Sequence, residues 1–105
     1  MEIKFGKEYL YELYTIGKSK NKKYRFQPNI VSKYTKLISV MITLPNTEAL
    51  FQYKSLHYEK LKGDKIGISS IRINDQYRIE FEEYIVNGQS YATVCNITEL
   101  SNHYK

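Results

Sequence analysis

The spacing of polar and apolar residues in the first half of the chain predicts a short strand followed by a helix. Residues 2–5 alternate between polar and apolar side chains, which is typical of a strand. From about residue 7 to residue 16, apolar side chains return at the spacing of one helix face, and Gly17 ends this predicted helix. The residues on that face are Leu10, Leu13 and Tyr14.

A second helix is predicted to begin at Pro28, because proline suits the first turn of a helix. Apolar residues then recur at steps of three and four and form a core-facing stripe. The stripe consists of Ile30, Val31, Tyr34, Leu37, Ile38 and Met41. Pro45 and Asn46 stop this helix, and Thr47 is expected to cap a short helix through residues 49–51.

After residue 64 the apolar period changes to two, which predicts a run of strands. One strand has Ile71 and Ile73 on its apolar face, and the next has Tyr77, Ile79 and Phe81. Asn87-Gly88 predicts a hairpin turn because both residues tolerate positive φ, and a third strand is expected over residues 91–98. The predicted fold class is α+β, with the N-terminal helices packed on one face of a small, mostly antiparallel sheet.

Length and charge narrow this picture. The chain has 105 residues, which predicts a single domain over residues 1–105. Lys and Arg number 16 against 11 Asp and Glu, so the formal net charge is +5 and favours polyanions or acidic proteins as partners.

The cysteine and histidine content argues against several classes of protein. Cys95 is the single cysteine, so it can form neither an internal disulfide nor a structural zinc site, and we expect a buried, inert thiol in mid-strand. Two histidines are few for a metalloenzyme. No apolar run is long enough to span a bilayer, and the start lacks the apolar stretch of a secretory signal, so a cytoplasmic location is expected.

Residues 18–25 carry five positive charges and no acid. Two interpretations are open. Such a run is often a solvated loop. It can also be an arm that follows a phosphate backbone, where each phosphate that is neutralised releases a counterion.

Strand register places two arginines opposite each other. The predicted strands before and after residues 74–76 both have odd-numbered residues on the apolar face. Paired residues lie on the same face, so an odd-numbered residue must pair with an odd-numbered one and an even-numbered residue with an even-numbered one. A three-residue connection of residues 74–76 puts Ile73 opposite Tyr77 and Arg72 opposite Arg78. Like charges at paired positions are destabilising. Either Glu80, Glu82 or another acid neutralises them, or the pair awaits an anion such as a phosphate.

The chain also contains 11 tyrosines. Tyr77 falls on the apolar face, which favours core packing for this ring. Exposed tyrosines beside basic groups could instead stack on bases.

The second half of the chain resembles the HigB-type killer toxins of the RelE/ParE superfamily. The resemblance is carried by Leu56-His57, Leu61-Lys62-Gly63-Asp64, Ser70-Ile71-Arg72-Ile73-Asn74 and Tyr77-Arg78-Ile79-Glu80-Phe81, and Asn102-His103-Tyr104 extends it. The first half agrees with the family in layout, a short strand followed by helices. The resemblance therefore implies a RelE-like fold.

The resemblance also implies an activity and partners. It points to the toxin of a type II toxin–antitoxin pair that cuts mRNA on the translating ribosome and is silenced by a helix-turn-helix, HigA-like antitoxin. In such cleavage a ribose 2′-OH attacks the neighbouring phosphate, cations stabilise the transition state, and neither a metal nor another cofactor is needed. The implied catalytic residues are Lys62, Arg72, Arg78, His103 and Tyr104. The implied RNA-binding residues are His57, Lys60 and Lys65.

Two other functions stay open. The first is a ParE-like inhibitor of DNA gyrase that performs no chemistry, because one fold supports several functions. The second is a catalytically inert member that only binds its antitoxin. It is suggested by the ending Asn102-His103-Tyr104, where the family commonly has an acidic residue followed by Tyr and His.

Overall fold

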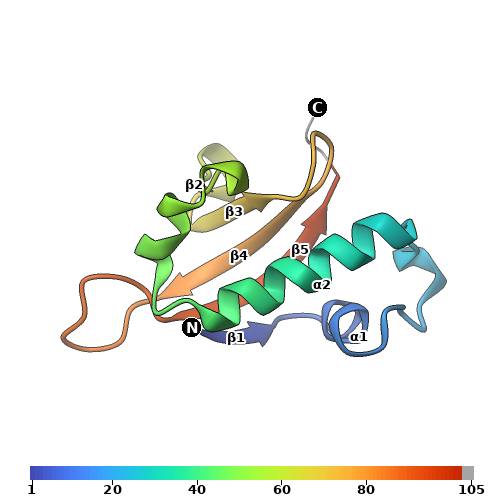
Figure 1. Cartoon of the computed structure of the whole chain (residues 1–105), viewed down its shortest axis with the longest axis horizontal. Coiled ribbons are helices and arrows are strands. Elements are labelled where there is room, and N and C mark those ends of the chain that lie inside the picture. Colours follow the sequence, from blue (N-terminus) through green and yellow to red (C-terminus); the bar gives the residue numbers. More distant parts are fainter. Residues whose placement is uncertain (103–105) are drawn as a thin grey trace.

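The computed structural model describes residues 1–102 and contains one five-stranded sheet. The strands lie in the order β1-β5-β4-β3-β2 (Figure 1). Their bounds are Glu2–Phe5 for β1, Glu59–Lys60 for β2, Ile68–Arg72 for β3, Arg78–Tyr84 for β4 and Val94–Ser101 for β5. β1 runs parallel to β5 and the other three pairs are antiparallel, so the predicted mostly antiparallel sheet is confirmed.

Two α-helices cover one face of this sheet, as predicted (Figure 1). Helix α1 spans Glu8–Ile16 and ends at Gly17, whose φ of 78° is left-handed and suits a residue without Cβ. Helix α2 spans Pro28–Thr43, with Pro28 in its first turn. All six residues of the predicted stripe on α2 are buried.

The core lies between the helices and the sheet. Residues Ile71, Ile79 and Phe81 of the sheet are fully buried, and the Tyr34 hydroxyl of α2 donates a hydrogen bond of 2.8 Å to the carbonyl of Leu10 in α1. Tyr77 is half-buried and packs against this core, as predicted.

Cys95 is fully buried in β5, and burial raises the pKa of its thiol to about 12. The predicted burial of this thiol is therefore confirmed. Among the described residues, no helix is both long and apolar enough to cross a membrane.

Within residues 1–102, four short 3-10 helices complete the connections. They are η1 (Lys22–Tyr24), η2 (Thr47–Gln52), η3 (Lys54–Leu56) and η4 (Gly63–Lys65). The predicted cap of η2 was wrong, because Asn46 occupies the capping position and Thr47 is the first helical residue.

The predicted hairpin turn at Asn87-Gly88 is confirmed, because the Gln89 amide donates a hydrogen bond of 3.1 Å to the Val86 carbonyl across this pair and β4 pairs antiparallel with β5. Only Gly88 of this pair has positive φ, 79°, and the connection between β4 and β5 covers residues 85–93. The third strand begins at Val94 instead of residue 91 and runs on to Ser101. The physical reason is a tertiary contact. The carbonyl of the buried Ala92 accepts a hydrogen bond of 3.0 Å from the Thr47 amide, and this bond keeps Ala92 out of the ladder with β4.

Candidate functional site

The face of β3 and β4 turned away from the helices carries the predicted arginines. Side chains alternate between the two faces of a strand, so Arg72 and Arg78 lie opposite to their neighbours Ile71 and Ile79, which fill the core. The ladder pairs Arg72 directly with Arg78, as the register argument predicted. The turn between them is held by the Asn74 side chain, whose oxygen accepts hydrogen bonds from the amides of residues 76 and 77 at 2.9 and 2.8 Å.

Arg78 is held firmly at the edge of this surface. Its side chain is only 11% exposed, and its guanidinium donates a hydrogen bond to the carbonyl of His57. An Nη1 to carboxylate distance of 3.5 Å joins it to Glu59 of β2. His57 closes η3 with a φ of 47°, the left-handed region that non-glycine residues rarely adopt, and this turn presents the carbonyl that receives Arg78.

Arg72 is held more loosely. Its guanidinium pairs with Asp75, three residues later. The arginine side chain is 34% exposed and the aspartate 94% exposed, so water competes for both groups. Such an exposed pair contributes little to stability and can exchange partners readily.

The two arginines therefore have acidic neighbours, as the first of the two interpretations expects. Asp75 pairs with Arg72 and Glu59 with Arg78, whereas Glu82 accepts a hydrogen bond from Asn96 at 3.0 Å. Both neutralising carboxylates are largely exposed, and an incoming anion can displace an exposed partner without uncovering a buried charge.

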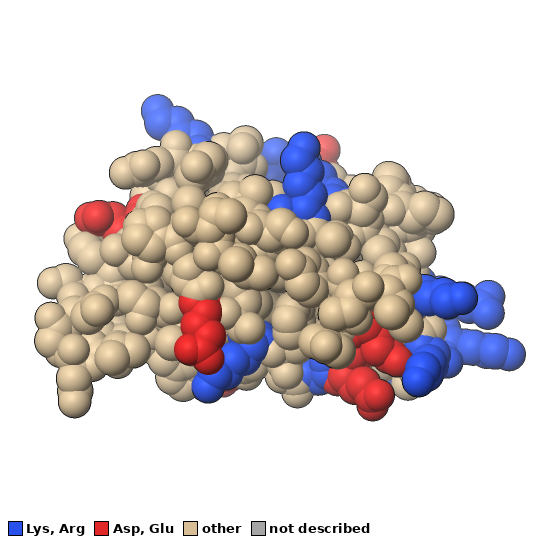
Figure 2. All heavy atoms as spheres, turned by 60° about the horizontal axis from the view of Figure 1, so that its bottom comes forward, with Lys and Arg blue, Asp and Glu red and all other residues tan. Residues whose placement is uncertain are grey.

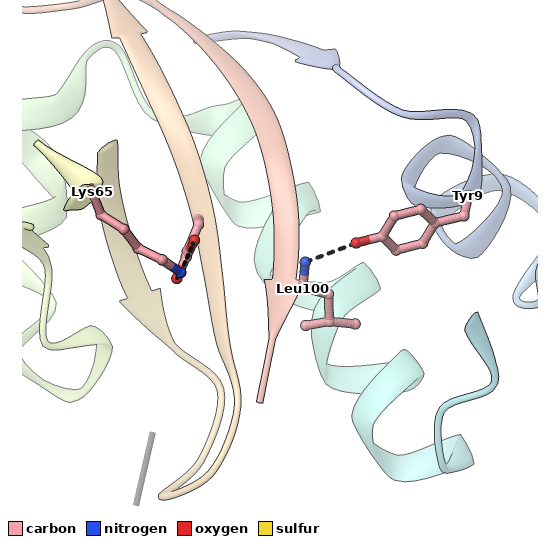
Figure 3. A network of polar contacts seen from close by, with 4 residues as sticks. Tyr9, Lys65 and Leu100 are labelled. Atoms are coloured by element: carbon pink, nitrogen blue, oxygen red, sulfur yellow. Dashed lines mark hydrogen bonds and ion pairs between the residues drawn. The ribbon is translucent and has the colours of Figure 1, made fainter. Parts of the chain in front are cut away.

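A third cation on this face has a different environment. The Lys65 ammonium lies 2.9 and 2.8 Å from the two carboxylate oxygens of Glu80 (Figure 3). The Glu80 side chain is only 4% exposed and that of Lys65 is 40% exposed. A buried carboxylate needs such a partner, so this lysine is committed to the structure of the sheet.

The remaining predicted site residues are distributed around this surface. Lys60 lies in β2, Lys62 stands at the start of η4, and His57, whose carbonyl holds Arg78, follows η3. The side chains of His57 and Lys60 are exposed, and Lys62 is exposed as well. His103 and Tyr104 lie outside the described residues, so their assignment stays a prediction. The structure thus brings together Arg72, Arg78 and the backbone of His57.

The comparison with protein families decides what kind of protein this surface belongs to. A family model described as a RelE-like toxin of the type II toxin–antitoxin system HigB matches residues 3–96. The chain belongs to this family of HigB-like toxins. The predicted family is confirmed, and the match extends through the helical first half, where the sequence agreed only in layout.

Solved structures share the fold of this HigB-like toxin. A YoeB/ParE toxin from Agrobacterium tumefaciens is 18% identical and superposes with a TM-score of 0.59, covering 99% of this chain and 100% of that one. A YoeB–YefM complex from Staphylococcus aureus matches at 20% identity with a TM-score of 0.57, covering 99% and 98%. These likenesses confirm the predicted RelE-like fold. A comparison with curated protein sequences gives no significant match.

Sequence reasoning missed Asp75 and Glu59 near the site of the HigB-like toxin, and it named Glu80 as a candidate acid without foreseeing its partner Lys65. Asp75 follows Arg72 by three residues across a turn, so its ion pair could have been anticipated. Glu59 and Glu80 gave no such indication, because their partners lie 19 residues later and 15 residues earlier in the chain and meet them only in the folded sheet.

Proposed function

We propose that this toxin is an endoribonuclease that cuts mRNA on the translating ribosome through attack of a ribose 2′-OH on the adjacent phosphate. The observation that carries the proposal is the direct pairing of Arg72 with Arg78 on the face of the sheet that the helices leave open. Two guanidinium groups across one ladder position are unfavourable alone and favourable around a phosphate.

The two arginines suit different steps of this reaction. Arg78 is nearly buried and fixed by the His57 carbonyl, so it is oriented before the substrate arrives and needs no rearrangement as negative charge develops on the phosphate. Arg72 exchanges its exposed partner Asp75 for a phosphate oxygen. Lys62, exposed at the start of η4, is proposed as a further cation.

A proton acceptor is also needed. Glu59 places a 54% exposed carboxylate beside Arg78, at 3.5 Å, where it is within reach of a ribose whose phosphate lies on the arginines. We therefore add Glu59 to His103 and Tyr104 as a candidate for proton transfer. His57 and Lys60 remain the proposed RNA-binding residues at the edge of the site, whereas the ion pair of Lys65 with the buried Glu80 argues against the predicted RNA-binding role of this lysine.

The proposal includes a partner. A type II toxin is paired with an antitoxin, and one structural neighbour is described as a YoeB–YefM complex. We propose a helix-turn-helix, HigA-like antitoxin for this chain, with acidic groups that complement the net charge of +5 and speed capture. Both toxin and antitoxin would act in the cytoplasm, where the ribosomes are.

The test is primer extension on a reporter mRNA in a translation extract, with and without ribosomes. Wild type should give cuts only with ribosomes, and Arg78→Ala should reduce cutting by about 100-fold or more, the usual loss when one fixed donor to a transition-state charge is removed. The matched control is Lys36→Ala, an exposed lysine on α2, which should cut like wild type. Thermal unfolding of each variant separates loss of the site from loss of the fold.

Intact mRNA with folded wild-type protein contradicts the proposal. A DNA-damage response in expressing cells would then indicate the gyrase inhibitor, and unaffected growth with a co-purifying antitoxin would indicate the inert family member.

A further inference from the structure

The basic segment at residues 18–25 is anchored to the body of the protein. Glu12 of α1 is 9% exposed and accepts hydrogen bonds from the Ser19 hydroxyl at 3.0 Å and the Lys20 amide at 3.4 Å. The Asn21 side chain caps η1 by accepting from the Lys23 amide at 3.0 Å. A loop that merely keeps a protein soluble does not need a buried carboxylate and a capped turn to fix its backbone.

Aromatic rings tie the same segment to the end of β5. Tyr24 stacks on Tyr9 with ring centroids 3.7 Å apart and planes within 2°. The Tyr9 hydroxyl accepts a hydrogen bond of 3.2 Å from the amide of Leu100 in β5 (Figure 3). Phe26, just after the basic run, meets Tyr77 edge-on at 6.0 Å, and Tyr77 directly precedes Arg78. The cations of the segment are therefore held at a fixed place relative to the arginine pair.

A cleft of about 440 Å³ opens between this segment and the end of β5. Its lining includes three cations and three partly buried rings: Lys7, Lys23, Arg25, Tyr24, Phe26 and Tyr77. Among the described residues that line it, Glu99 is the one acid. Figure 2 shows basic groups gathering at the right-hand end of the molecule, where Figure 1 places the connection between α1 and α2. The Lys23 ammonium lies 5.6 Å from the centre of the Tyr24 ring, so cation and ring face the same space.

We propose that this cleft binds the backbone and a base of single-stranded RNA next to the segment held by the arginine pair. Lys7, Lys23 and Arg25 bind phosphates, and a base lies against the partly exposed rings. The alternation of cations and rings favours RNA over an acidic peptide, because carboxylates need the cations but gain nothing from aromatic faces, whereas every base has a face that stacks. This inference rests on the proposed function for the identity of the strand, but binding is measurable without cleavage.

The experiment uses a fluorescein-labelled 2′-O-methyl RNA of twelve nucleotides, which cannot be cut by 2′-OH attack. Anisotropy gives its dissociation constant at several KCl concentrations for wild type, for Lys23→Ala/Arg25→Ala and for Lys33→Ala/Lys36→Ala. The last pair lies exposed on α2 and also removes two positive charges, so it controls for net charge. Because the cleft variant neutralises two fewer phosphates, its slope of log K against log salt should fall by about 1.4, whereas the slope of the control should stay unchanged.

A second variant tests the stacking of a base on the aromatic rings without changing the charge of the cleft. Phe26→Leu keeps an apolar side chain but removes the aromatic face, and it should weaken RNA binding about fivefold or more with an unchanged salt slope.

Equal slopes for the two double variants would overturn the inference. So would a cleft variant that binds RNA normally but loses affinity for a labelled twelve-residue polyglutamate, since that result assigns the cleft to an acidic peptide. If the wild type cuts mRNA on ribosomes but the two double variants have equal slopes, only the proposed RNA-binding cleft is contradicted. If the slopes differ but no mRNA is cut, RNA binding by the cleft is supported and the proposed endoribonuclease is contradicted.

Discussion

The two faces of β3 and β4 are made by neighbouring residues of the same strands, yet they differ in almost every physical respect. Ile71, Ile79 and Phe81 face the helices and are 0% exposed. Arg72 and Arg78, one position away, form a layer of charge whose carboxylate partners, Asp75 and Glu59, are 94% and 54% exposed. One face supplies most of the hydrophobic free energy of folding, whereas the exposed ion pair of Arg72 with Asp75 on the other face contributes little stability.

Two ion pairs on the charged face show which property distinguishes a charge that stabilises the fold from one that is proposed to bind substrate. Lys65 and Arg72 lie on the same face, and each has an acidic partner. The partner of Lys65 is 4% exposed and that of Arg72 is 94% exposed. The exposure of the partner, more than that of the cation, separates an ion pair that stabilises the fold from the one that we propose exchanges its acid for substrate.

The variant Lys65→Met tests how much stability depends on the charged face of the sheet. It removes the ammonium group from a carboxylate that is almost wholly buried, and we expect a loss of about 1–3 kcal/mol in the free energy of unfolding, moderated by the partial exposure of Lys65. Urea denaturation measures this loss. The double variant Lys65→Met/Glu80→Gln should recover most of it, because the buried charge is gone. A loss below about 0.5 kcal/mol for the single variant would show that groups other than Lys65 stabilise the Glu80 carboxylate.

The variant Arg72→Ala tests whether an exposed ion pair on this face matters for cleavage and little for stability. Its free energy of unfolding should change by less than about 1 kcal/mol, since the pair with Asp75 is exposed. Cleavage of ribosome-bound mRNA should nevertheless fall by about 100-fold. Asp75→Asn, which removes the competing acid and leaves the arginine, should cut at least as well as wild type. Equal cutting by Arg72→Ala and wild type would remove this arginine from the proposed site.

The smallest expected effect concerns Tyr9, on the helix side of the sheet, and its dependence on pH. Burial raises the pKa of this hydroxyl to about 12 from an ordinary value near 10. The folded state therefore holds the proton more tightly, and this contribution is complete below pH 10 and is lost as the pH rises from 10 to 12. At pH 8, Tyr9→Phe should be less stable by about 1 kcal/mol, because the bond from Leu100 is removed.

That deficit of Tyr9→Phe should shrink as the pH approaches about 11.5, since only the wild type has this hydroxyl to ionise. Urea midpoints measured from about pH 8 to about pH 11.5 test it. Other buried tyrosines such as Tyr58, whose raised pKa comes from burial and Glu83 and not from Tyr9, titrate alike in both proteins and cancel in the difference. A constant deficit across this range would mean that Tyr9 ionises no differently in the folded and unfolded chain.

Much of the fold could be predicted from the sequence because its elements have strong local patterns. The stripe on α2 and the alternation in β3 and β4 each depend on residues close together in the chain. The start of β5 could not be predicted, because it depends on a bond between Ala92 and Thr47, 45 positions apart, that competes with the ladder. The parallel pairing of β1 with β5 likewise has no local indication.

The candidate site shows the same limit. The pairing of Arg72 with Arg78 follows from parity and a short connection, so sequence alone is sufficient for it. Glu80 occupies an alternating polar position that predicts exposure, and its burial beside Lys65 appears only once residues 63–65 fold back over the sheet. The role of Glu59 beside Arg78 has the same origin, because its two-residue strand has too little pattern to detect.

The position of β5 between β1 and β4 also determines when the protein can fold during its synthesis. Residues 2–5 find their partners only at residues 94–97, so β1 stays unpaired while the intervening chain is made, roughly 5–20 seconds at ordinary rates of translation. The hairpin of β3 and β4 can form earlier, but β5, which pairs with β4, is the last of the described strands to be made. A ribosome making this toxin therefore carries an incomplete sheet until β5 leaves the exit tunnel, and the surface that holds Arg72 and Arg78 gains its last neighbouring strand only after that point.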